Sequence, residues 1–173
     1  MIVARTPAHA ERRVRDVLQQ ALSCVTAGVF VYGLRSVTTE LSQTSRLARS
    51  GGGHVTLTVD HRYSVVNVAD GDRAASWQAR TAAYMYTLED ADGLEILAYH
   101  WHPAGRSPVS EPHLHIGGGA GALRTELQKA HIATGPVTPV ALLSLLIDAF
   151  AVRPRRPDWR PVLLRARQAL DLS

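Results

Sequence analysis

The feature that most constrains the fold is a two-residue alternation of apolar and polar side chains in the middle of the chain. It runs through residues 54–59 and again through 75–88, which places the apolar side chains of each segment on one face of an extended strand. An acidic-glycine run at 90–93 then supplies a tight turn, and a return strand follows it. We therefore expect residues 29–116 to form mostly antiparallel strands.

The pairing of the two strands around that turn is also predicted. If Glu89 pairs with Leu94, Tyr84 lies opposite Tyr99 on an aromatic face that suits packing under helices.

Helical signals flank these strands on both sides. Thr6 followed by Pro7 predicts a helix start, and apolar residues at helical spacing extend the helix over 7–24. Thr138 with Pro139 begins a second helical region, and two helices separated by a proline-rich connector are expected within 138–172. The sequence thus predicts a single α+β domain over residues 1–173. It is an antiparallel β-sheet with a histidine-bearing hairpin, flanked by an N-terminal helix and two C-terminal helices.

Composition excludes several classes of protein. The chain has 173 residues, 46% of them apolar, which suits one globular core. Its richest apolar stretch, 140–147, is far shorter than the ~20 residues that a membrane span needs, and residues 1–7 lack the pattern of a secretory signal. A cytoplasmic protein without membrane contact is expected. The lone Cys24 cannot form an internal disulfide or a cysteine metal site, so any metal would need histidine ligands.

Five of the eight histidines fall between positions 100 and 131. Four of them form two His-x-His units, and the two-residue spacing puts each pair on one face of its own strand: His100, His102, His113 and His115. Proline and glycine between the units predict a hairpin. A register centred on that loop places His100 opposite His115 and His102 opposite His113, so four imidazoles would share one patch.

Two chemistries fit such a patch. Neutral imidazoles within reach of one another can ligate a divalent metal, or one can act as base while a protonated partner acts as acid in phosphodiester cleavage. No carboxylate occupies a matching strand position, so we expect a metal-independent site in which all four histidines are catalytic, with a metal held by the same four as the alternative. The histidines can also be half-exposed strand residues with no such role. For His131 a capping or core role and an active-site role are equally expected. The glycine run at 117–121 is expected to be a flexible connector more than a phosphate site.

The chain has a net charge of +4, and the segment from residue 153 onward has the same net charge by itself, with six arginines and two aspartates. Eighteen of the nineteen basic residues are arginine. Either a coding bias or a need for guanidinium groups that bind phosphate would explain this preference. A candidate nucleic-acid strip in the C-terminal segment comprises Arg153, Arg155, Arg156 and Arg160, and a solvated surface is the alternative.

The order of elements around the histidines is distinctive. A tyrosine-bearing strand and an acidic-glycine turn come first, then a return strand ending in His100 and His102, and then Pro112-His113-Leu114-His115-Ile116 before a final helix. This arrangement resembles the TumE-like toxins of bacterial toxin–antitoxin pairs. The likeness covers about residues 80–150. The chain departs from that pattern in having His100 and His102 where an aspartate and an asparagine are expected. The resemblance implies a growth-inhibiting cytoplasmic protein neutralised by a helix-turn-helix antitoxin.

Two hypotheses of function follow. In the first, the chain is a bacterial toxin-like ribonuclease or phosphodiesterase that uses its histidines without a metal. In the second, it is a non-enzymatic metal-binding or protein-interaction module built on the same histidines.

Overall fold

Helix α1 (Pro7–Leu22) begins where the sequence predicts, because the hydroxyl of Thr6 accepts a hydrogen bond from the backbone N–H of His9. In the same way the hydroxyl of Thr138 accepts from the N–H of Ala141 at the start of α3 (Pro139–Asp148). Helix α4 (Trp159–Leu170) follows after a non-helical connector. The computed structural model describes residues 3–35, 37–68, 76–104, 109–121 and 130–170, and the statements below concern these residues.

All pairs of neighbouring strands in the sheet are antiparallel, and the order along it is β2-β3-β4-β5-β6-β7-β8. A short first strand also pairs with the start of β5. The bounds are β1 (Val3–Ala4), β2 (Val31–Arg35), β3 (Thr38–Ala48), β4 (His54–Asn67), β5 (Trp77–Glu89), β6 (Glu95–Trp101), β7 (His113–Ile116) and β8 (Ile132–Ala133).

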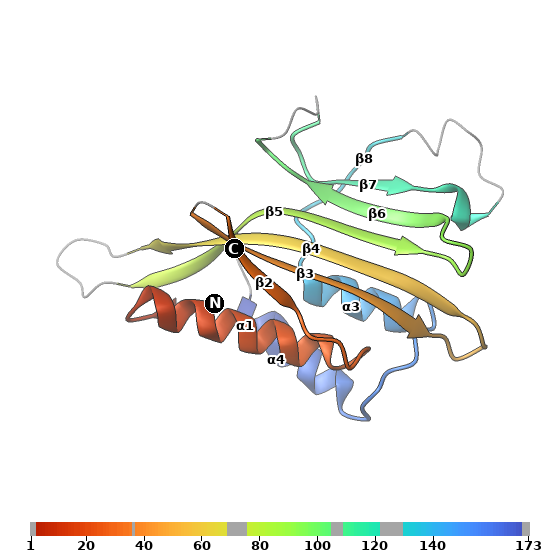
Figure 1. Cartoon of the computed structure of the whole chain (residues 1–173), viewed down its shortest axis with the longest axis horizontal. Coiled ribbons are helices and arrows are strands. Elements are labelled where there is room, and N and C mark those ends of the chain that lie inside the picture. The colour runs from red at the N-terminus through yellow and green to blue at the C-terminus, as the bar shows by residue number, and fades with distance from the viewer. Residues whose placement is uncertain (1–2, 36, 69–75, 105–108, 122–129, 171–173) are drawn as a thin grey trace.

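The three helices cover one face of this sheet (Figure 1). The alternation in β4 decides which face, because its odd-numbered residues from Val55 to Tyr63 are buried while the even-numbered ones between them are only partly buried. Tyr86 and Leu97 extend the buried face into β5 and β6, and the apolar sides of the helices complete one core. The predicted α+β class is confirmed, including the N-terminal helix and the two C-terminal helices.

The predicted pairing of β5 with β6 is wrong by two residues. Tyr84 lies opposite Trp101 and Tyr86 lies opposite Tyr99, because Glu89 pairs with Glu95 instead of Leu94 and the register shifts by one more residue between Leu88 and Glu89. A shift of two keeps every side chain on its predicted face, and the aromatic residues do pack toward the helices.

Among the described residues, no helix combines the length and the apolar character needed to cross a membrane.

Candidate functional site

The two His-x-His units lie on adjacent strands, and their side chains project from the face of the sheet that lacks the helices. His100 pairs with Met85, whose neighbours Tyr84 and Tyr86 point into the core, so Met85 and His100 point the other way. His113 pairs with His100 and His115 pairs with Ala98, which puts both on the same outer face. The sequence-predicted residues are therefore brought together. We call them, with His131, the histidine cluster.

The register within this hairpin differs from the prediction. His100 lies opposite His113, not His115, and Ala98 takes the place opposite His115. The cluster forms nonetheless, because a two-residue slip leaves the same side chains on the same face. The proline-containing loop is not a tight turn, so its midpoint does not fix the register.

The imidazole rings are in mutual contact. Ring centroids are 5.7 Å apart for His100 and His113, 4.8 Å for His100 and His115, and 4.9 Å for His113 and His115. His102 lies 5.8 Å from His100 at the side of this group. Nitrogen atoms of His100, His113 and His115 all lie within 4.8 Å of one another, so among the described residues these three form a group that could hold a metal ion.

His131 joins the cluster from the last strand. Its ring centroid is 4.5 Å from that of His115 and 5.1 Å from that of His113. Strand β8 pairs antiparallel with β7, with Ala133 opposite His113, and continuing that register puts His131 beside His115. Sequence reasoning left its role open, because a two-residue strand has too little alternation to be recognised.

His113 is the fixed member of the cluster. It is 3% exposed, and its Nδ1 lies 2.8 Å from the backbone carbonyl of Glu111. A carbonyl can only accept, so Nδ1 carries the proton and donates it. In the neutral tautomer that this bond selects, Nε2 has the lone pair, which can bind a metal ion or a proton.

Burial and crowding keep two other rings neutral. Burial first, and then the neighbouring imidazoles with His115 foremost, together lower the pKa of His100 to about 4. The pKa of His115 is lowered by burial and then by His131, His113 and His102. Both rings are therefore neutral at pH 7.

Acidic groups lie next to the cluster without belonging to it. A hollow of about 360 Å³ beside the cluster is lined by His102, Glu40, Asp60, Arg62 and Met85, and Tyr84 and Trp101 at the end of the β5–β6 pair also reach it. Burial raises the pKa of Asp60, and the charge of Glu40 raises it further. These carboxylates come from β3 and β4, strands that sequence reasoning did not connect with the hairpin.

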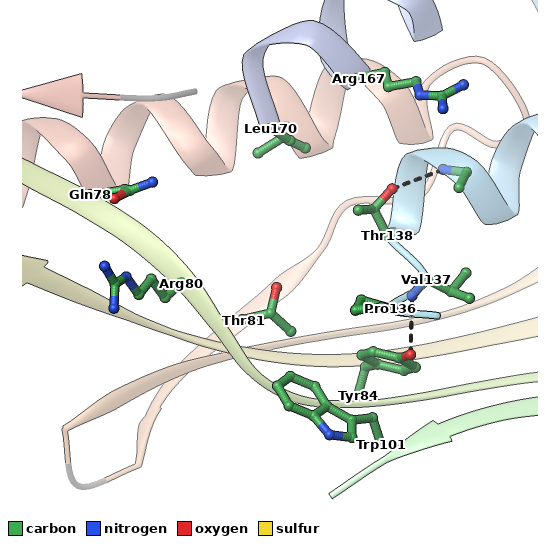
Figure 2. Close-up of a pocket in the computed structure, with 11 residues that line it drawn as sticks. Gln78, Arg80, Thr81, Tyr84, Trp101, Pro136, Val137, Thr138, Arg167 and Leu170 are labelled. Carbon is green, nitrogen blue, oxygen red and sulfur yellow. Dashed lines mark hydrogen bonds between the residues drawn. The ribbon is translucent and has the colours of Figure 1, made fainter. Parts of the chain in front are cut away.

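A larger hollow lies on the helix side of the β5–β6 pair. Its volume is about 590 Å³, and Tyr84 and Trp101 line it from the sheet (Figure 2). Trp101 stands between His100 and His102 in sequence but points to the opposite face. No sequence pattern predicts this hollow, because its other walls come from segments far apart in the chain.

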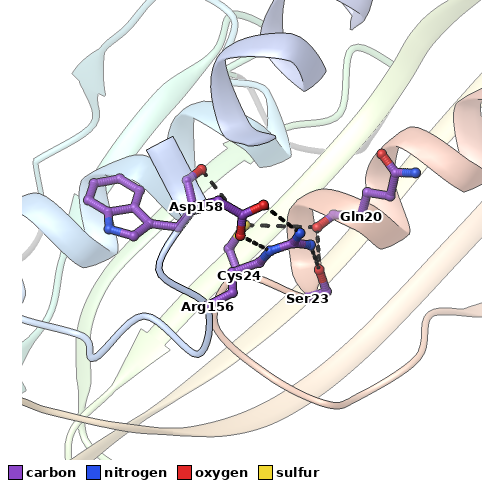
Figure 3. Close-up of polar contacts among 6 residues, drawn as sticks. Gln20, Ser23, Cys24, Arg156 and Asp158 are labelled. Atoms are coloured by element: carbon purple, nitrogen blue, oxygen red, sulfur yellow. Dashed lines mark hydrogen bonds and ion pairs between the residues drawn. The ribbon is translucent and has the colours of Figure 1, made fainter. Parts of the chain in front are cut away.

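The predicted arginine strip lies beside the helices, away from the histidine cluster. Arg156 makes a two-pronged ion pair with Asp158, at 2.6 and 2.8 Å, and also donates to the hydroxyl of Ser23 (Figure 3). The guanidinium of Arg160 stacks 4.4 Å above the ring of Trp159. Arg153 and Arg155 are exposed, and their backbone N–H groups bond to Ala48 and Cys24. An RNA strand that touched both groups would have to pass around the edge of the sheet.

The glycine run, which the sequence predicts to be a flexible connector, packs closely against the start of β6. Gly117 donates its N–H to the carbonyl of Ile96, and a short 3-10 helix, η1 (Gly118–Ala120), follows. A Cβ atom at Gly117 would overlap the backbone carbonyl of Glu95, so glycine is needed there for close approach of two chain segments.

His61, which sequence reasoning did not single out, is buried beneath the helices. Its Nδ1 lies 2.7 Å from the hydroxyl of Tyr86, and its ring stacks against Tyr86 and Tyr84. Burial lowers its pKa to about 4. The signal that could have found it is the alternation of β4, in which His61 takes an inward position.

No family model, curated protein or solved structure matches this chain. The site is therefore interpreted from its own geometry.

Proposed function

We propose that this chain binds one divalent transition-metal ion through His100, His113 and His115. The observation that carries the proposal is the meeting of three imidazole nitrogens within 4.8 Å of one another on adjacent strands. Ligand atoms around a tetrahedral zinc ion lie about 3.3 Å apart, as follows from its ~2.0–2.1 Å bonds. Small rotations of the half-buried His100 and His115 rings toward the fixed His113 would close that difference.

The state of the ligands supports metal binding over acid–base chemistry. A ring whose pKa is about 4 is a weak base at neutral pH, whereas a neutral imidazole is the form that a metal binds. The bond from His113 Nδ1 to the Glu111 carbonyl is of the kind that orients metal-ligating histidines.

The donor set also limits which metal would bind. Three imidazoles suit zinc, copper, nickel or iron and do not suit calcium or magnesium, which prefer oxygen ligands. Three protein ligands leave one position of a tetrahedral ion for water or substrate. A metal-bound water there would supply a nucleophile at neutral pH.

The test is metal analysis of protein purified without a histidine tag. After incubation with Zn²⁺ and removal of the excess, the parent should retain about one ion per chain, and His115→Ala and His100→Ala should retain far less. His9→Ala and His54→Ala, which remove histidines outside the cluster, are the matched controls. Equal metal in the parent and His115→Ala, with both folded by circular dichroism, would contradict the proposal.

The metal-independent ribonuclease is the second candidate, and the orientation of His113 is the observation that favours it. The bond from Nδ1 leaves its Nε2 free to act as the base, and His102 and His131, with ring centroids 6.1 and 5.1 Å away, are the candidates for the acid. Cleavage of RNA that persists in a chelator and disappears in His100→Ala and His113→Ala would support this candidate. Cleavage abolished by the chelator and restored by zinc would support the metal site.

The resemblance to TumE-like toxins adds the proposal of a toxin-like role with a helix-turn-helix antitoxin. Its test is bacterial growth with the chain expressed alone and together with its neighbouring gene. Growth inhibition that the neighbour relieves would support it, and normal growth in both cultures would count against it.

A further inference from the structure

We infer that the hollow on the helix side of the β5–β6 pair is a second binding site, for a small planar-ring ligand that carries negative charge. This site lies on the opposite face of the sheet from the histidine cluster. It is independent of the metal proposal.

The hollow is built from four separate parts of the fold, one of which is Trp101 of β6. Strand β5 contributes Gln78, Arg80 and Thr81, and the segment leading into α3 contributes residues 136–138. The end of α4 adds Arg167 and Leu170. Its volume of about 590 Å³ falls within the range of ~300–1,000 Å³ that is typical of small-molecule sites.

One wall offers a flat aromatic surface. Trp101 is partly exposed and lies beside Tyr84, with ring centroids 5.9 Å apart. Tyr84 is only 3% exposed and already stacks on Tyr86, so the indole of Trp101 is the ring available for stacking. Pro136, Val137 and Leu170 supply further apolar contact (Figure 2).

Hydroxyl groups give the hollow directed hydrogen-bond donors. Tyr84 Oη accepts a bond of 3.0 Å from the N–H of Val137, and Thr138 Oγ1 accepts one of 3.1 Å from the N–H of Ala141. Each oxygen uses acceptor capacity in these bonds and keeps its own proton. Both hydroxyls can therefore donate to a ligand oxygen.

Charge selects the class of ligand. Arg80 and Arg167 are exposed and lie on opposite sides of the hollow, one on β5 and one on α4; both guanidinium groups point outward in Figure 2, and their long side chains can turn toward a bound anion. No aspartate or glutamate occurs among the described residues that line it. Two guanidinium groups, hydroxyl donors and an indole together fit an anion with a planar ring, as in a nucleotide or an aromatic carboxylate.

The test uses adenosine 5′-monophosphate as the probe, with adenosine and inorganic phosphate as the two partial ligands. Isothermal titration with chelator-treated protein should show binding of the monophosphate that exceeds the binding of either part at least tenfold. Tryptophan fluorescence should change on binding, and Trp101→Leu should abolish that change. Because the protein is treated with chelator, binding of the monophosphate does not depend on whether the histidine cluster holds a metal ion.

Matched arginine variants decide whether the pocket itself binds. Arg167→Gln and Arg80→Gln should each weaken binding about tenfold, the loss expected for one charge-assisted hydrogen bond. Arg165→Gln changes an exposed arginine of the same helix that does not line the hollow, and it should bind like the parent. Equal weakening by Arg165→Gln and Arg167→Gln overturns the inference. So does a lack of binding at millimolar concentration by both the monophosphate and benzoate, a simple aromatic carboxylate.

Discussion

His100 lies directly opposite His113 across the β6–β7 pair, with their ring centroids 5.7 Å apart. One of the two rings is half-buried and adjustable, and the other is buried and held by the Glu111 carbonyl. A metal ion bound between them would join two strands whose pairing spans only four residue pairs. Metal binding should therefore raise the free energy of unfolding of the protein.

The first prediction concerns that stabilisation. A ligand that binds only the folded state at 100 times its dissociation constant adds about 2.7 kcal/mol to the free energy of unfolding. For a chain of this size that corresponds to a rise of about 5–10 °C in Tm. Thermal unfolding with and without Zn²⁺ measures it. The rise should vanish in His115→Ala and persist in His54→Ala, and an equal rise in all three proteins would assign the effect to unspecific binding.

The second prediction concerns acid stability and the buried His61. Its pKa is about 4 in the folded protein and about 6.5 in the unfolded chain, so between these values the unfolded state binds more protons. Folding should therefore lose stability as pH falls from about 6.5 to 4, by up to about 3 kcal/mol from this residue alone, and the loss should be absent above pH 7.

Urea unfolding of the parent and of His61→Gln at several pH values measures this contribution. Glutamine keeps a polar partner for Tyr86 and does not titrate, so the stability of the variant should fall less steeply across that range. His100 and His115 contribute equally to both proteins and cancel in the comparison. Parallel curves for the two proteins would show that His61 is not the acid-sensitive group.

The third prediction concerns the connector after β7. Gly117→Ala places a methyl group against the backbone carbonyl of Glu95, and backbone cannot move aside as a flexible side chain can. The free energy of unfolding should fall by about 1–3 kcal/mol, the usual range for an overpacked site. Gly118→Ala is the control, because a Cβ atom there meets nothing within 4 Å. Similar destabilisation by both changes would mean that loss of flexibility, not overlap, is the cause.

Sequence reasoning succeeded where a local rule decides the structure. Thr6 and Thr138 start their helices because a hydroxyl next to proline satisfies a free backbone N–H, and no tertiary contact is needed for that. The face on which each histidine lies depends only on the two-residue repeat of a strand, so the cluster itself was predictable.

The sequence did not determine what depends on distant partners. The register of β6 with β7 is set by packing along the whole hairpin, and the midpoint of a long loop does not report it. His131 reaches the cluster through a strand of two residues, and His61 is buried because α1 and α3 cover β4. The hollow beside Trp101 brings together segments from residue 78 to residue 170, and no spacing rule links them.

The last prediction concerns the arginine strip, whose four members differ in what holds them. If the strip binds RNA, Arg153→Glu and Arg155→Glu should weaken binding for all sequences alike, and each lost phosphate contact should flatten the salt dependence by ~0.7–0.9. Arg156→Gln is expected to act differently, because it breaks the bonds to Asp158 and Ser23 that tie the connector to the end of α1. It should lower Tm with little change in the salt slope. Filter binding at several salt concentrations, together with thermal unfolding, separates the two effects. If Arg153→Glu and Arg155→Glu leave both affinity and slope unchanged, the strip is a solvated surface, and any contact with RNA must come from the histidine face of the sheet.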